Sequence, residues 1–150
     1  MSLSASQAAQ ELLTRMEAKE SLRHYVALTQ ALPKPARHHD LLIRELEAVE
    51  RGEVENLMVL MPPGSAKSSY ASVVFPAWFV GRNPELSLLA ASHTQELADS
   101  FGRKTRNLVT SPGHQRVFAT ALAEDNKAAG RWETDAGGGY FAAGVGGSVT

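Results

Sequence analysis

The sequence predicts an α/β fold in which helices flank a parallel sheet, with a helical extension at the N-terminus and a sheet left incomplete at the C-terminus. Two short apolar runs, residues 56–61 and 86–91, have the composition of strands that are covered on both faces. A helical pattern follows each run. This alternation is typical of parallel α/β units, in which the loops that follow the strands gather at one edge of the sheet.

The region before the first run predicts two helical segments. Ser4 and Gln7 have the spacing of a capping box at the start of the first segment, and the two prolines within residues 32–35 stop it. The apolar residues expected on its buried face are Leu12, Leu13, Met16, Leu22, Val26 and Leu28. We expect the second helix over residues 36–51, with Gly52 at its end.

Each apolar run is followed by a further helix. After the first run we expect a helix over residues 67–79, which Pro76 should kink or end. After the second run, Ser92 and Gln95 have capping-box spacing and predict a helix that continues to about residue 109.

The last part of the chain is rich in glycine, with seven of the 12 glycines after residue 129. Residues 131–135 and 140–145 are predicted to form a β-hairpin around residues 137–139. Trp132 is expected either in the core of this hairpin or, together with Arg131, stacked on nucleic acid.

The composition excludes several classes of function. Hydrophobic residues make up 43% of the 150 residues, which is enough for a core, and the net charge of −1 argues against a general nucleic-acid coat protein. The absence of cysteine excludes disulfides, Cys-ligated metals and thiol catalysis. The chain has no apolar stretch near the roughly 20 residues that span a bilayer and no apolar signal-peptide core. We therefore expect a soluble, intracellular protein with no membrane partner.

The loop after the first apolar run is the most informative part of the sequence. A phosphate-binding loop (P-loop) needs inward backbone amides, a helix N-terminus, and a Lys followed by Ser or Thr to meet phosphate and Mg²⁺. Lys67 and Ser68 satisfy the last requirement. The general pattern also needs glycines where Met61 and Ala66 stand, and a positive φ at Ala66 would cost energy. An ordinary strand-to-helix turn with a surface lysine is the alternative.

Several stretches of the chain occur in a characteristic order. They are residues 36–42, 51–53, 57–68, 75–79, 81–84, 90–94, 97–103, 106–107 and 137–147. This ordered set resembles the N-terminal ATPase part of a tailed-phage terminase large subunit, the motor that pumps DNA into a procapsid. The resemblance implies a P-loop NTPase-type fold, with a helical N-terminal segment over residues 1–35 and a partial ATPase domain over residues 36–150.

The resemblance also implies roles for individual residues. The residues that would cradle the triphosphate of ATP are Gly64, Ser65, Ala66, Lys67, Ser68 and Ser69, with Lys67 on the β- and γ-phosphates and Ser68 on Mg²⁺. His39 is a candidate adenine contact, because it lies where the family has its adenine-contacting motif; an exposed residue at a helix start is the alternative. The family's loop often contains an arginine, and Gly64 and Ser65 stand there instead. The catalytic residues and the arginine finger therefore stay unassigned.

The partners implied are double-stranded DNA, the portal protein, the small terminase subunit and further copies of the chain in a ring, acting in the host cytoplasm at the procapsid. The Walker B acids and the nuclease domain would follow residue 150; Glu124 and Asp125 are expected in a solvated loop or helix end. We therefore expect the isolated chain to bind ATP without appreciable hydrolysis. The alternatives are a non-catalytic prophage remnant or fragment that acts as a binding module, and a small P-loop kinase, for which no lid is recognisable.

Overall fold

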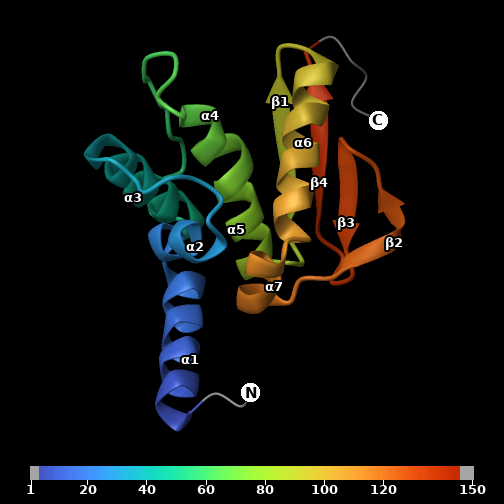
Figure 1. Cartoon of the computed structure of the whole chain (residues 1–150). Helices are drawn as coiled ribbons and strands as arrows, with labels where there is room; N and C mark the ends of the chain where they lie inside the picture. Colours follow the sequence, from blue (N-terminus) through green and yellow to red (C-terminus); the bar gives the residue numbers. More distant parts are fainter. Residues whose placement is uncertain (1–3, 146–150) are drawn as a thin grey trace.

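The computed structural model describes residues 4–145, with the side chains of residues 125–127 left out. Its helical elements are α1 (Ala5–Glu20), α2 (Leu22–Thr29), α3 (Arg37–Glu50), α4 (Lys67–Ser69), a π-helical turn η1 (Tyr70–Val74), α5 (Phe75–Arg82), α6 (Gln95–Val109) and α7 (Pro112–Phe118). The strands are β1 (Ser87–Ser92), β2 (Leu122–Lys127), β3 (Arg131–Thr134) and β4 (Gly139–Gly144). Figure 1 shows the first three helices on one side of the α4–α5 segment and the sheet, with α6 packed on it, on the other.

The sheet has the strand order β1-β4-β3-β2 and is mixed. β1 runs parallel to β4, from Ser87 opposite Gly139 to Ser92 opposite Gly144, whereas β3 is antiparallel to both β4 and β2. The α/β class is confirmed, but the expectation of a parallel sheet is wrong for two of its three strand pairings. The physical reason is the hairpin, because a tight turn can join only antiparallel strands.

The first apolar run, residues 56–61, does not form the expected strand. Within the part of the chain that the structure describes, its backbone groups join no strand ladder. The side chains still alternate: Leu57, Val59 and Met61 pack on the helical core, whereas Met58 and Leu60 are 82% and 85% exposed. The segment is therefore extended without a neighbour that could supply strand hydrogen bonds.

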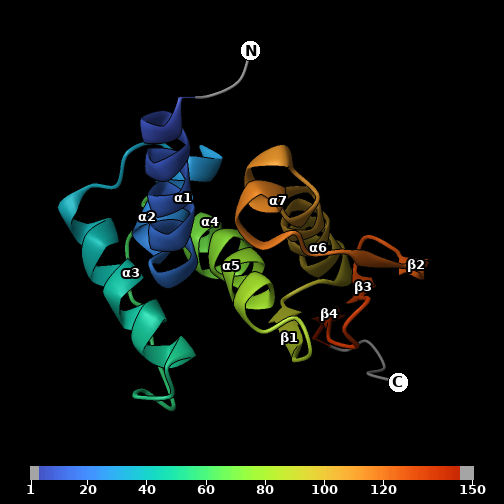
Figure 2. The same ribbon diagram turned by 90° about the horizontal axis from the view of Figure 1, so that it is seen from below.

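The N-terminal helix is divided in two and only partly buried. Ser21 ends α1 and caps α2 through its side chain. The expected common buried face is correct for Leu22 and Val26, which are fully buried, but wrong for α1, where Leu12, Leu13 and Met16 are exposed. Figure 1 shows that α1 extends beyond the other helices. From Glu11 onward it still meets α2 and α7, which lie beside it in Figure 2, but these contacts leave Leu12, Leu13 and Met16 uncovered.

Pro76 neither ends nor sharply interrupts the helical segment that follows the loop. Lys67 to Arg82 is helical throughout, but it passes through the π-helical turn, in which the Phe75 amide donates to the Tyr70 carbonyl. Pro76 has no N–H to offer the Ser72 carbonyl. The Thr105 hydroxyl of α6 donates to the Phe101 carbonyl of its own helix at 2.9 Å and lies 3.4 Å from the Ser72 carbonyl, a long contact between this segment and α6.

The second half of the chain follows its pattern more closely. Thr94, rather than Ser92, caps α6, and Ser111 caps α7. The hairpin is confirmed, and Trp132 lies in its core: the indole is fully buried, stacks on Tyr140 at 5.4 Å and donates through Nε1 to the Gly102 carbonyl at 3.2 Å. Glu124 and Asp125 belong to strand β2, not to a loop or helix end.

Two of the predicted segments extend past the residues that the structure describes. Residues 146 and 147 of the glycine-rich segment, like residues 1–3 of the helical N-terminal segment, lie outside the described residues. No helix found within residues 4–145 is both long and apolar enough to cross a membrane.

Candidate phosphate-binding site

The loop between the extended segment and α4 has an unusual backbone. Gly64 and Ala66 both adopt the left-handed region, with φ of 79° and 57°. The Ser65 amide, which lies between them, donates to the Pro62 carbonyl at 3.3 Å and tightens the turn. For alanine this conformation costs about 1–2 kcal/mol, so the expected energetic cost at Ala66 is present in the structure.

Helix capping does not account for Ala66. The other non-glycine residues described with positive φ, Gln30 and Ala119, are the C-caps of α2 and α7, where the left-handed conformation is common. Ala66 instead precedes a helix, where the capping residue is ordinarily extended. Strain at such a position is characteristic of ligand sites.

The same backbone leaves a row of donors at the loop. The first hydrogen bond of the helical segment joins the Tyr70 amide to the Ala66 carbonyl at 3.1 Å, so the amides of Lys67, Ser68 and Ser69 precede any intrahelical acceptor. A left-handed residue followed by a right-handed one turns successive amides toward one side, which forms a concave site for an anion. The positive end of the helix dipole adds to this preference.

A hollow of about 390 Å³ lies inside the loop and is lined by residues 61–69. The Lys67 ammonium donates to the Met61 carbonyl at 3.5 Å, so the side chain folds back over the loop. Ser68 is exposed beside it. All six residues predicted for triphosphate binding therefore lie around one cavity, and Lys67 is the only charged side chain among the described residues that line it.

Two buried hydroxyls at this loop lack a hydrogen-bond partner among the described residues. They are Ser65 Oγ and Tyr70 Oη. Burial raises the pKa of the Tyr70 phenol, and the charge of Arg23 nearby opposes this increase. An orphaned hydroxyl in the loop itself fits a site that is completed by a polar ligand.

His39 reaches this loop from the first turn of α3. Its Nδ1 accepts a hydrogen bond from the Ala36 amide at 3.1 Å, and its Nε2 lies 3.0 Å from the Ser65 carbonyl. The neutral tautomer with the proton on Nε2 satisfies both contacts. The ring stacks on Tyr70 with a centroid distance of 4.8 Å. The contact of His39 with adenine stays a prediction. The contact that the structure shows for Nε2 is with the Ser65 carbonyl of the loop.

The sequence did not reveal these contacts. Twenty-six positions separate His39 from Ser65, and no periodicity or spacing links them. For Tyr70 the sequence offered one weak signal: it lies one turn after Lys67 on the same helical segment, a spacing at which two side chains share a helix face.

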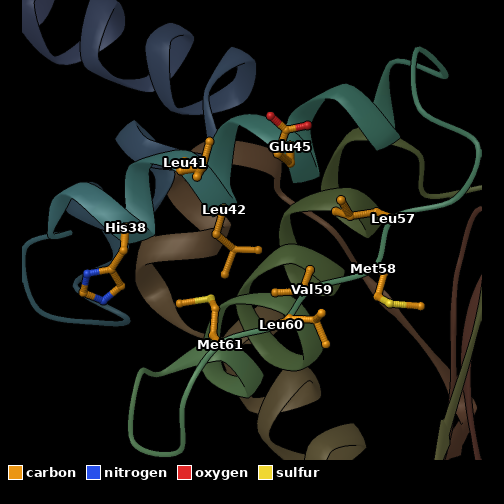
Figure 3. A pocket seen from close by; sticks show the side chains of 9 residues that line it. All are labelled: His38, Leu41, Leu42, Glu45, Leu57, Met58, Val59, Leu60 and Met61. Atoms are coloured by element: carbon orange, nitrogen blue, oxygen red, sulfur yellow. The ribbon is translucent and has the colours of Figure 1, made fainter.

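An apolar groove of about 340 Å³ adjoins the loop (Figure 3). It lies between α3 and the extended segment, where Leu42, Val59 and Met61 point toward one another. Met61 borders both the groove and the loop hollow. The polar side chains that line the groove are His38 and Glu45.

Metal binding at this site would depend on oxygen atoms that a bound phosphate compound supplies. In the described part of the chain, no group of three or more His, Asp or Glu residues is placed to hold a metal ion. A hydroxyl such as that of Ser68, together with phosphate oxygens and water, is a ligand set that Mg²⁺ accepts.

Comparisons with known protein families, with curated proteins and with solved structures gave no match to this chain.

Proposed function

We propose that this chain binds a nucleoside triphosphate, ATP, with Mg²⁺ at residues 64–69, as the nucleotide-binding part of a phage DNA-packaging ATPase of the terminase large-subunit kind. The observation that carries the binding proposal is the left-handed Ala66 at the entrance of a helix. This backbone conformation is strained, and helix capping does not need it. It turns successive amides of the loop toward one side, where an anion can accept hydrogen bonds from them. The orphaned hydroxyl of Ser65 supports it.

Each group at the loop has a role in this proposal. The amides of Lys67, Ser68 and Ser69 donate to phosphate oxygens at the helix N-terminus. The Lys67 ammonium exchanges its contact with the Met61 carbonyl for the phosphates. The Ser68 hydroxyl is a ligand for Mg²⁺, which would neutralise charge on the triphosphate when bound.

The residues that line the hollow supply affinity rather than catalysis. Within the described residues, no carboxylate lines the hollow that could orient an attacking water. Binding that is equally strong in the ground state and the transition state does not lower the barrier to hydrolysis. We therefore propose nucleotide binding as the activity of these residues.

The wider setting rests on the resemblance of the ordered motifs. We propose double-stranded DNA, a portal protein and a small terminase subunit as partners, a ring as the assembled form, and the procapsid in the host cytoplasm as the place of action.

Replacing Lys67 tests the nucleotide site. We expect Lys67→Ala to weaken ATP binding at least tenfold, about 1.4 kcal/mol, because no other described residue that lines the hollow carries a charge. Isothermal titration with Mg²⁺ measures the affinity, and circular dichroism should be unchanged because the side chain is partly exposed. Lys19→Ala, on the exposed face of α1, is the matched control. Equal ATP affinity of wild type and Lys67→Ala would refute the proposal.

A further inference from the structure

We propose that His39 is a positioning residue for the phosphate-binding loop: its Nε2–H holds the Ser65 carbonyl and thereby orients the Ala66 amide toward bound phosphate. This inference rests on the proposed function, and it gives His39 a role toward the loop rather than toward the base. The observations behind it are two hydrogen bonds, a ring contact and the geometry of one peptide group.

The imidazole is fixed from several directions. The Ala36 amide holds Nδ1, the ring of Tyr70 covers one face, and the ring of His38 lies 3.9 Å away between centroids. A side chain held in this way directs its remaining nitrogen to one place, and that place is the Ser65 carbonyl.

The helix that carries His39 is itself firmly placed. Leu42 and Leu46 on α3 are buried in the helical core. Arg23 of α2 forms an ion pair with Asp40, the residue after His39. The bond to Ser65 therefore connects the loop to a rigid element rather than to another loop.

The Ser65 carbonyl controls the amide that follows it. A trans peptide group is planar, so its C=O and N–H point in opposite directions. Holding the Ser65 carbonyl toward α3 fixes the Ala66 N–H on the side away from α3. The same peptide leads into the left-handed Ala66, whose conformation an alanine does not prefer without outside support.

A pair of substitutions separates the two ring nitrogens. His39→Asn keeps an acceptor at the place of Nδ1 but is too short to reach Ser65, whereas His39→Gln keeps a donor as far from the backbone as Nε2. Both remove the ring from Tyr70. Asn keeps only the bond to Ala36 and Gln keeps only the bond to Ser65, so weaker binding by the Asn variant than by the Gln variant reports the bond to Ser65. His24→Asn is the matched control, because His24 is an exposed histidine of α2 whose Nε2 lies 4.0 Å from Glu17 of α1 and not at the loop.

The titrations use the full chain with Mg²⁺ and three ligands: ATP, GTP and inorganic triphosphate. We expect His39→Asn to weaken all three by one common factor, about three- to tenfold, which corresponds to the loss of one hydrogen bond. We expect His39→Gln to stay within about twofold of wild type and His24→Asn to have no effect. A general loss of stability would not distinguish Asn from Gln in this way.

Three results would overturn the inference. One is a loss with His39→Asn that is confined to ATP, since that indicates a base contact. Another is unchanged affinity in His39→Asn while Lys67→Ala loses binding, which leaves the nucleotide site standing and removes only the role of His39. The third is equal or absent binding in wild type and Lys67→Ala, which removes the proposed function as well.

A measurement on the wild type does not depend on the folding of any variant. In nitrogen–proton correlation spectra, we expect the Ala66 amide to shift on addition of inorganic triphosphate with Mg²⁺. An Ala66 amide that does not respond while those of Lys67 and Ser68 do would contradict the proposed orientation.

Discussion

Two apolar runs with the same sequence pattern form different structures in this molecule: one becomes a strand of the sheet and the other does not. Residues 87–92 pair along their whole length with β4 and form β1, whereas residues 56–61 remain extended without joining the sheet. Both alternate between covered and exposed side chains; Leu89 of β1 is 64% exposed and Leu60 is 85% exposed.

The difference lies in the partners of the backbone and not in the side chains. β1 lies beside β4, the second strand of the hairpin, and its backbone groups on that side are bonded within the sheet, of which β1 is an edge strand. The other run has only side-chain contacts, through Leu57, Val59 and Met61 on the helical core. An apolar pattern thus indicates a segment that suits a sheet, but a neighbouring strand decides whether a strand forms.

The largest change in the free energy of unfolding is expected from a substitution in the hairpin core that packs beside β1. Trp132→Ala should lower the free energy of unfolding by about 3–5 kcal/mol, because it empties the centre of the sheet core beneath Tyr140 and Gly102. Urea denaturation followed by circular dichroism measures it. Leu89→Ala, on the exposed side of β1, is the control and should change stability by less than about 0.5 kcal/mol. A small effect of Trp132→Ala would mean that the hairpin does not hold β1.

Acidification should instead weaken the helical side, on which the unpaired run packs. His114 is fully buried between Tyr25 Oη at 2.7 Å and Thr120 Oγ1 at 3.0 Å, and burial lowers its pKa from 6.5 to about 4. Between these values the unfolded chain binds a proton that the folded chain does not, so stability falls as the pH is lowered from 6.5 to 4, by roughly 3 kcal/mol.

Chemical denaturation at several pH values measures this loss, and His114→Gln should flatten the dependence in that window. A variant that keeps the full slope would show that other groups cause it. His24, which is exposed, offers the matched control in His24→Gln.

The smallest effect is expected on the outer side of the unpaired run. Leu60→Thr should change the free energy of unfolding by less than about 0.5 kcal/mol, because the side chain contacts little. Val59→Thr, one position away but packed on the core, should cost about 1 kcal/mol or more, since it places a hydroxyl among apolar groups. Urea midpoints compare the two. Equal costs would mean that both faces of the segment are covered in solution.

Local patterns predicted much of this fold. The helix over residues 36–51 with Gly52 after it, the hairpin and the position of the loop before α4 follow from caps, turns and period, which are properties of neighbouring residues. The pairing of residues 56–61, the exposure of α1 and the bond from His39 to Ser65 depend on what lies nearby in space. No pattern along the chain carries that information.

The π-helical turn after the loop also sets the angular relation between two sets of side chains. A turn with one extra residue rotates everything after it by about 100° relative to an uninterrupted α-helix. Lys67 can therefore face the loop while Trp78 faces inward to the Ala18 carbonyl, 3.1 Å from its indole nitrogen. In a continuous α-helix the direction of the Lys67 side chain would determine that of Trp78. The turn η1 changes this relation, so Lys67 and Trp78 can face different parts of the molecule although both lie on the segment Lys67–Arg82.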